Sequence, residues 1–231
     1  MSAKRIAIVQ SNYIPWKGYF DLIHAVDEFV LFDTAQFTRR DWRNRNRIKT
    51  PGGLQWLSIP VATKGRYLDA ICDIEVSDPT WNQRHWRTIA ANYSRAAHFR
   101  TLGPAIEALF LECRESRLSA INFYFLKGLC ALLGISTPLT WSSDYRMAEG
   151  QTERLVSICV EAGASVYLSG PSASSYLDPE AFAKSAVRLE YFDYAGYPEY
   201  EQLYPPFEHG VSVIDLLLHE GPQASRYMLT F

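Results

Sequence analysis

Residues 10–20 gather the side chains that are best suited to holding a ligand. They read QSNYIPWKGYF, so two amides, several aromatic rings and a lysine fall within one short stretch. Amides hydrogen-bond polar groups and aromatic rings stack on flat ones, which suits a flat or polar ligand. A loop whose rings cap the core is the alternative. The candidate binding residues here are Gln10, Asn12, Tyr13, Trp16, Gly18 and Tyr19.

A second candidate region is the basic segment 39–49. Six of its eleven residues are arginine or lysine, in a chain whose formal net charge is −2. Because guanidinium groups bind phosphate or carboxylate through paired hydrogen bonds, we expect an anion here, either a nucleotide-linked substrate or the 3′ end of a nucleic acid. A solvated loop is the alternative. The candidate binding residues in and near this segment are Asp33, Gln36, Asn46, Arg47 and Lys49.

Two later loops carry further polar side chains, each after an expected strand. Their hydroxyl groups and glycine amides could bind phosphate or sugar oxygens, and a simple polar turn is the alternative. The candidates are Ser143 and Asp144 in the earlier loop, and Ser169, Gly170, Ser172 and Ser175 in the later one.

His85 and Lys17 are the candidate catalytic residues. The ordinary pKa of histidine suits proton transfer near neutral pH, so we expect His85 to act as a general base. Its place on an apolar helix stripe leaves a packing role as the alternative. No group of His, Cys, Asp and Glu has metal-ligand spacing, so we expect no metal site. No Gly-x-Ser-x-Gly motif supports a serine hydrolase.

Strand and helix patterns alternate along the chain, and these elements must position the candidates. A strand at Arg5–Val9, a helix at 19–26 and a strand at 28–33 form a β-α-β unit, which implies a parallel sheet with a right-handed crossover. Further strands are expected at 54–61, 136–141, 164–168 and 187–191. Further helices are expected at 81–93, 104–114, 118–133, 152–162, 179–184 and 213–219, the last two capped by Asp178 and Ser212.

The predicted fold is an open parallel α/β sheet of Rossmann-like type, similar to the nucleotidylyltransferase and HUP-like sheets, with a helical insertion at about residues 80–133. We expect Arg5–Val9 at its centre and 28–33 beside it. Ligands of such sheets bind at the carboxyl ends of the strands. One cleft should therefore be bordered by Tyr13, Trp16, Gly18, Asp33, Asn46, Arg47 and residues 169–175.

Length and composition restrict the class of protein. The chain has 231 residues, 48% of them hydrophobic, which predicts one α/β domain over residues 1–231. The weak net charge argues against general nucleic-acid binding. The four cysteines form no CxxC pair, and no apolar run is long enough for a signal-peptide core or a membrane span. We therefore expect a cytoplasmic protein with reduced thiols and no membrane partner.

The first loop also resembles the His-x-Gly-His motif of nucleotidylyltransferases and class I aminoacyl-tRNA synthetases. The spacing is kept as Trp16-Lys17-Gly18-Tyr19, with aromatic residues in place of both histidines. The imidazoles that would steady a transferred phosphate are therefore absent. The resemblance implies a nucleotide pocket without the usual phosphoryl-transfer donors.

Taken in order, the segments of this chain resemble the WbqC-like family over nearly the whole length. Val9-Gln10-Ser11 departs from the His-Gln-Pro that often begins the family's first motif. The resemblance implies a role in O-antigen, capsule or other specialised biosynthesis. The matching pieces are 10–20, Asp33 with Gln36, 46–49, 56–61, His85 with Tyr93, Ser143-Asp144, 168–170 with 175–177, 204–207 and 212–217.

Three functions are open at this point. The first is a transferase of polysaccharide-precursor or specialised-metabolite biosynthesis, which moves an aminoacyl or acyl group from an activated, nucleotide-bearing donor to an amine or hydroxyl. The second is an ATP-dependent nucleotidyl transferase or ligase, in which Lys17 and the arginines replace histidine. The third is a non-catalytic sugar-nucleotide binding protein. The expected partners are a small-molecule substrate, an adenosine- or uridine-containing donor, or an aminoacyl-tRNA end.

Overall fold

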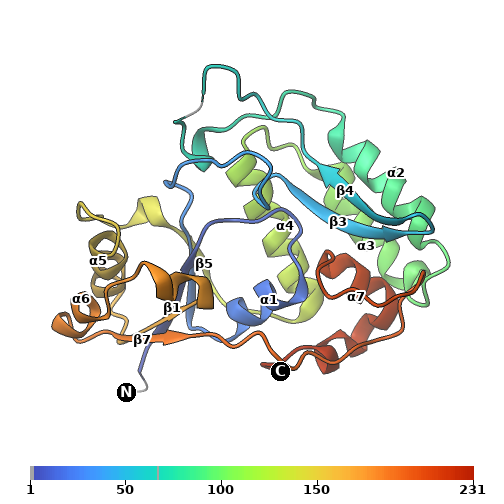
Figure 1. Cartoon of the computed structure of the whole chain (residues 1–231). Helices are drawn as coiled ribbons and strands as arrows, with labels where there is room; N and C mark the ends of the chain where they lie inside the picture. Colours follow the sequence, from blue (N-terminus) through green and yellow to red (C-terminus); the bar gives the residue numbers. More distant parts are fainter. Residues whose placement is uncertain (1–2, 67) are drawn as a thin grey trace.

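A five-stranded parallel sheet forms the centre of the computed structural model, which describes residues 3–66 and 68–231 (Figure 1). The strand order is β5-β2-β1-β6-β7, and every neighbouring pair is parallel. The predicted parallel sheet is therefore confirmed, with β1 at its centre and β2 beside it. The strands are β1 (Arg5–Val9), β2 (Glu28–Leu31), β5 (Leu139–Trp141), β6 (Val166–Ser169) and β7 (Arg188–Tyr191).

Helices cover both faces of this sheet. Successive strand residues point to opposite faces, so Ile6 and Ile8 of β1 join one hydrophobic cluster and Ala7 joins another. The first cluster includes α5 (Glu153–Glu161) and α6 (Pro179–Lys184). The second, larger cluster includes α1 (Lys17–His24), α4 (Leu118–Leu133) and α7 (Val213–Glu220).

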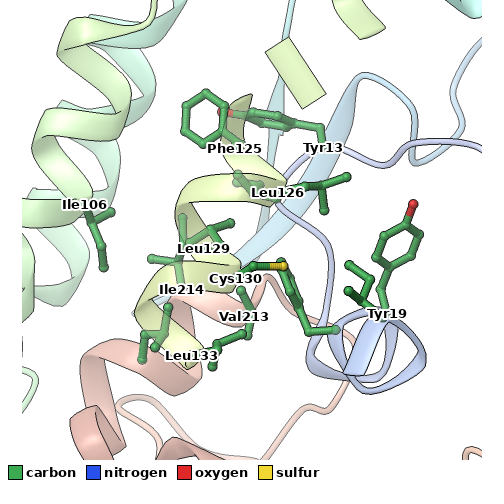
Figure 2. Close-up of a cluster of buried hydrophobic side chains, with 14 of the residues drawn as sticks. Tyr13, Tyr19, Ile106, Phe125, Leu126, Leu129, Cys130, Leu133, Val213 and Ile214 are labelled. Atoms are coloured by element: carbon green, nitrogen blue, oxygen red, sulfur yellow. The ribbon is translucent and has the colours of Figure 1, made fainter. Parts of the chain in front are cut away.

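The larger core extends beyond the sheet into α2 (Trp81–Tyr93) and α3 (Phe99–Glu112). Phe125 of α4 is fully buried at its centre, with ring centroids 5.6 Å from Tyr13 and 4.8 Å from Phe110. Figure 2 shows Tyr13 beside Phe125, with Leu126 and Leu129 along the same helix. The loop that follows β1 is thus attached directly to the helical part of the molecule.

Helix boundaries follow the predicted caps with one exception. The Asp178 carboxylate accepts a hydrogen bond from Glu180 N, and the Ser212 hydroxyl accepts one from Ile214 N. The exception is α3, which begins at Phe99 and not at Pro104. Pro104 lies inside α3, where it removes one helical hydrogen bond and its ring crowds the carbonyl four residues before it, so the helix forms because its packing in the core outweighs this cost. Four short 3₁₀ helices complete the list, at Ile71–Asp73, Ser142–Asp144, Pro171–Ser175 and Gly221–Tyr227.

The second half of the basic segment, from Arg45 onward, forms a strand that was not predicted from the sequence. β3 (Arg45–Thr50) pairs with β4 (Gly53–Ser58) in an antiparallel hairpin that is separate from the main sheet. The predicted strand at 54–61 therefore ends early, before Pro60. Two buried residues of β3, Asn46 and Lys49, are polar, and Lys49 is buried next to the buried Ile48, so a hydrophobicity pattern does not show the strand.

Residues 192–212 contain no helix or strand and are here called the strap. The strap leaves β7, passes over the start of α1 and reaches the hairpin before it enters α7 (Figure 1). Tyr194 of the strap contacts Trp16, and Gly210 accepts a hydrogen bond from Arg47. Irregular segments of this length in compact proteins are usually functional. The strap is therefore treated as part of the candidate site.

Replacing Phe125 by alanine should destabilise the protein by about 3–5 kcal/mol, because it removes a fully buried ring from the junction of the first loop and α4. The measurement is urea unfolding followed by circular dichroism. Val160→Ala on α5 is the control, since Val160 is 55% exposed, and it should change stability by less than about 0.5 kcal/mol. Equal effects of the two substitutions would contradict this packing.

Candidate functional site

A cavity of about 300 Å³ lies where the first loop, the hairpin and the strap meet, at the carboxyl end of β1. Its volume is at the lower end of the range for small-molecule sites. Two tryptophans give it flat apolar walls, and an arginine, a histidine and two amides supply polar groups. The lining residues are Asn12, Pro15, Trp16, Trp42, Asn46, Arg47, His209 and Gly210.

Asn46 holds the first loop in place. Its side-chain amide donates to the carbonyl oxygens of Tyr13 and Ile14, at 3.1 and 3.0 Å. Ile14 has a φ of 36°, in the left-handed region that a β-branched residue rarely adopts. Val213 N adds a bond of 2.8 Å to the Pro15 carbonyl. The loop therefore keeps a strained conformation because its neighbours bond its carbonyl groups on both sides.

Trp16 forms one wall of the cavity. Its indole lies against Gly18 so closely that a Cβ atom there would overlap the ring. The ring also contacts Tyr194 and Tyr197 of the strap, both with centroids 5.4 Å away. Gly18, a candidate binding residue, does not line the cavity, and its missing side chain makes room for the Trp16 ring.

Arg47 supplies the positive charge of the cavity. Its Nε donates to the Gly210 carbonyl at 3.1 Å, and a Cβ atom on Gly210 would overlap the guanidinium group. The guanidinium carbon lies 5.5 Å from the centroid of Trp42. Among the described residues, no carboxylate lies within ion-pair distance of Arg47. The Glu208 carboxylate lies nearby, where it accepts from Gly210 N at 2.7 Å, but it forms no ion pair with Arg47, so the guanidinium can still bind an anionic ligand.

His209 brings an imidazole with an unused nitrogen. Its Nδ1 is buried and has no hydrogen-bond partner among the described residues. The ring packs against Phe207, with centroids 4.6 Å apart. Burial and the nearby Lys17 ammonium lower the pKa of His209, so the ring is neutral at neutral pH and able to accept a proton. His209 was not predicted from the sequence, although it lies two residues after the family segment 204–207.

His85 lies in the interior and not at the cavity. It is 6% exposed, and both ring nitrogens are within hydrogen-bond distance of a partner, Ser58 O at 3.2 Å from Nε2 and Tyr13 OH at 2.8 Å from Nδ1. A carbonyl can only accept, so Nε2 carries the proton and Nδ1 accepts from the tyrosine hydroxyl. Burial lowers the pKa of His85 to about 4. His85 therefore has a packing role, and it is not placed to accept a proton from a ligand in the cavity.

The two lysines among the candidates are buried beneath the strap. Lys17 Nζ donates to the Pro198 carbonyl at 2.8 Å and lies 4.9 Å from the centroid of the Tyr197 ring. Burial lowers the pKa of Lys17 to about 8. Lys49 Nζ donates to Gln202 Oε1 at 2.9 Å and to the Pro206 carbonyl. Both ammonium groups therefore fasten the strap and do not line the cavity.

Several other candidates brace the first loop from behind. The Asp33 carboxylate accepts from Ser11 N at 2.8 Å and from the Ser119 hydroxyl, and burial raises the pKa of this carboxyl. Tyr19 OH donates to the Gln10 carbonyl at 3.0 Å. Tyr13 itself is fully buried. Of this group only Asn12, whose side-chain oxygen accepts from Arg43, reaches the cavity.

The remaining candidates lie outside the cavity. Ser169 is buried and donates to Tyr167 OH at 3.3 Å, while the Ser175 hydroxyl donates to the Ser172 carbonyl at 3.0 Å. The Ser169 loop opens at the same carboxyl edge as Trp16 but does not line the cavity. The other candidates outside the cavity are Gly170, Ser143, Asp144 and Gln36, the last in a separate depression with Arg39 and Arg66.

The residues that the structure describes contain no group of three or more His, Cys, Asp and Glu side chains arranged to hold a metal ion. None of their helices has the length and apolarity needed to cross a membrane.

The comparisons agree with the family resemblance. The family model of the WbqC-like protein family matches residues 10–227. The chain belongs to this family. It is 49% identical over 225 residues to a Mycobacterium tuberculosis protein named "Uncharacterized protein Rv1507c", an alignment that covers 97% of each chain. No solved structure matches. The WbqC-like match includes every residue that lines the cavity.

The interior position of His85 predicts how stability depends on pH. In the unfolded chain His85 binds a proton below its ordinary pKa of about 6.5. In the folded chain it binds that proton only below about pH 4. His85 therefore contributes full stability above pH 6.5 and loses it as the pH falls. In His85→Gln, which cannot titrate, the stability deficit relative to the native chain should shrink by about 2 kcal/mol from pH 7 to pH 5.

Urea unfolding at both pH values measures this difference. Ligand binding at pH 8 serves as the control and should be unchanged, because His85 does not line the cavity. A deficit that stays constant with pH would contradict the neutral, buried state of the imidazole.

Proposed function

We propose that this protein is a transferase that binds an activated, nucleotide-bearing donor in the cavity and passes an acyl or aminoacyl group to an amine or hydroxyl. The observation that carries the proposal is the Arg47 guanidinium between tryptophan walls, which forms no ion pair among the described residues, with the His209 imidazole lining the same cavity. Arginine suits the phosphate of a nucleotide and indole rings suit its base. An imidazole that is neutral at neutral pH suits proton transfer.

The position of the cavity supports a Rossmann-like assignment of the sheet and a single α/β domain with a helical insertion. Counted within the sheet, the strand order is 3-2-1-4-5, with the reversal of order next to β1. Ligands of such sheets bind outside the carboxyl ends of the strands at that reversal. The first loop leaves β1 at this point and contributes Asn12, Pro15 and Trp16 to the cavity.

In this proposal His209, and not His85, is the general base that accepts the proton of the acceptor group. The His209 imidazole accepts a proton from the acceptor amine or hydroxyl as the acceptor's nitrogen or oxygen attacks the donor carbonyl. The new C–N or C–O bond forms, the bond from that carbonyl to the donor's leaving oxygen breaks, and the imidazolium returns the proton to that oxygen. Arg47 holds the phosphate of the donor, and the Asn12 amide is placed to orient polar groups of either substrate.

Two alternatives are less well supported. For a nucleotidyl transferase or ligase, Lys17 would have to leave the Pro198 carbonyl to reach a phosphate. A non-catalytic sugar-nucleotide binding protein would have no use for the buried, unpaired His209 nitrogen, whose desolvation costs free energy. Membership of the WbqC-like family supports a place in polysaccharide-precursor or specialised-metabolite biosynthesis, which we propose takes place in the cytoplasm.

Mass spectrometry of what co-purifies with the protein tests the donor class directly. Recovery of an adenosine or uridine compound that carries an acyl group would support the transferase. Release of pyrophosphate on incubation with ATP would favour the nucleotidyl transferase instead.

Arg47→Ala should weaken binding of adenosine 5′-monophosphate and uridine 5′-diphosphate by about ten- to a hundred-fold, which corresponds to roughly 1.5–3 kcal/mol for a charge-assisted hydrogen bond. Isothermal titration calorimetry measures it. Arg40→Ala is the matched control, because Arg40 is exposed and outside the cavity, and its loss should cost at most about 1 kcal/mol. Equal losses for both variants, or no binding of either nucleotide by the native chain, would count against the proposed site.

A further inference from the structure

Four side chains of the hairpin region form a continuous arginine–tryptophan face, made of Trp42, Arg45, Arg47 and Trp56. The two tryptophan rings lie 5.2 Å apart, with Arg45 4.0 Å and Arg47 5.7 Å from the centroid of Trp56. Arg47 pairs with Trp56 across the hairpin, and Arg45 lies two residues before Arg47, so all three side chains share one face.

This face is exposed and its charge is not compensated. Trp42 and Trp56 keep 38% and 41% of their surface accessible, unusual for large aromatic side chains. Asp41 is the one carboxylate in segment 39–49, and it forms an ion pair with Arg43, at 3.5 Å. Within the described part of the chain, neither Arg45 nor Arg47 has a carboxylate at ion-pair distance. The face therefore offers flat surfaces and positive charge together.

The arginine–tryptophan face is continuous with the cavity. Trp42 and Arg47 belong to both, whereas Arg45 and Trp56 lie outside the lining. Successive outward residues of a strand are spaced by about 6.8 Å, so the two arginines present charges at regular steps away from the cavity. A ligand that fits wholly inside the cavity would leave Arg45 and Trp56 unused. A polymer whose end enters the cavity would use them.

We propose that the arginine–tryptophan face binds the single-stranded end of an RNA, whose terminal nucleotide occupies the cavity. The inference rests on the proposed function, since it makes the donor's nucleotide the last one of a strand. Bases stack on the tryptophan and guanidinium planes, and phosphates meet the arginine charges, which is how proteins bind single strands without reading a sequence. A neutral sugar polymer would use the rings but not the charges. An acidic peptide would use the charges but not the stack of flat groups.

Fluorescence anisotropy with a labelled single-stranded RNA of about eight nucleotides tests this inference, with adenosine 5′-monophosphate titrated in parallel by calorimetry. RNA should bind at least about ten-fold more tightly than the mononucleotide. Trp56→Ala should weaken RNA binding by at least about five-fold and leave mononucleotide binding unchanged. Arg45→Ala should reduce the slope of log affinity against log salt by about 0.7.

Arg100→Ala on α3 is the matched control, because Arg100 is an exposed arginine outside the face, and it should change neither RNA affinity nor salt slope. A duplex of the same sequence should bind more weakly than the single strand, since its bases are not free to stack on the protein. Equal affinity for RNA and mononucleotide, or equal effects of Trp56→Ala and Arg100→Ala, would overturn the RNA inference while the cavity kept its proposed function. If the native chain binds no mononucleotide, the proposed function itself is overturned.

Discussion

The amide of Asn46 is the interaction on which the candidate site depends most. It joins the hairpin to the first loop by donating two hydrogen bonds to adjacent carbonyl groups, those of Tyr13 and Ile14. Without it, two buried acceptors would lose their partner and Ile14 would be free to leave its left-handed conformation. Trp16 on the loop and Arg47 on the hairpin keep their distance across the cavity because this one side chain fixes both backbones.

The strap closes the same arrangement from the other side, and cationic side chains fasten it. Lys17, Arg47 and Lys49 each donate to a carbonyl oxygen of the strap. In the middle of the strap, Tyr200 and Gln202 donate to the buried Asp215 carboxylate of α7, at 2.7 and 2.9 Å. These bonds and the bond from Arg47 to Gly210 lie on either side of His209 and hold it at the cavity. Several of the cationic side chains that suggested a ligand therefore bond backbone carbonyl groups of the strap.

The sequence was a good guide to the sheet and a weaker one to the site. Apolar β-branched runs such as Arg5–Val9 and capping residues such as Asp178 report local physics, so strands and helix starts could be predicted. The hairpin strand could not, because Asn46 faces inward to make hydrogen bonds that only the folded loop explains. Asn12 and Trp16 were found because they follow a predicted strand, and Asn46 and Arg47 because they lie in a segment rich in basic residues. His209 sits in a segment without periodic structure, where position carries no signal.

Residue type alone also cannot separate a group that bonds a ligand from one that bonds the protein. His85 and Lys17 have the chemistry of catalysis, yet each is already bonded within the protein, His85 through both ring nitrogens and Lys17 to the Pro198 carbonyl. His209 and Arg47 differ in what is left over, an unpaired nitrogen in one and an uncompensated charge in the other. Burying a polar group without a partner costs free energy. Other buried atoms without a partner, such as Asn122 Oδ1 and Ser165 Oγ, lie outside the cavity, so it is their position in the aromatic cavity that makes His209 and Arg47 the candidates.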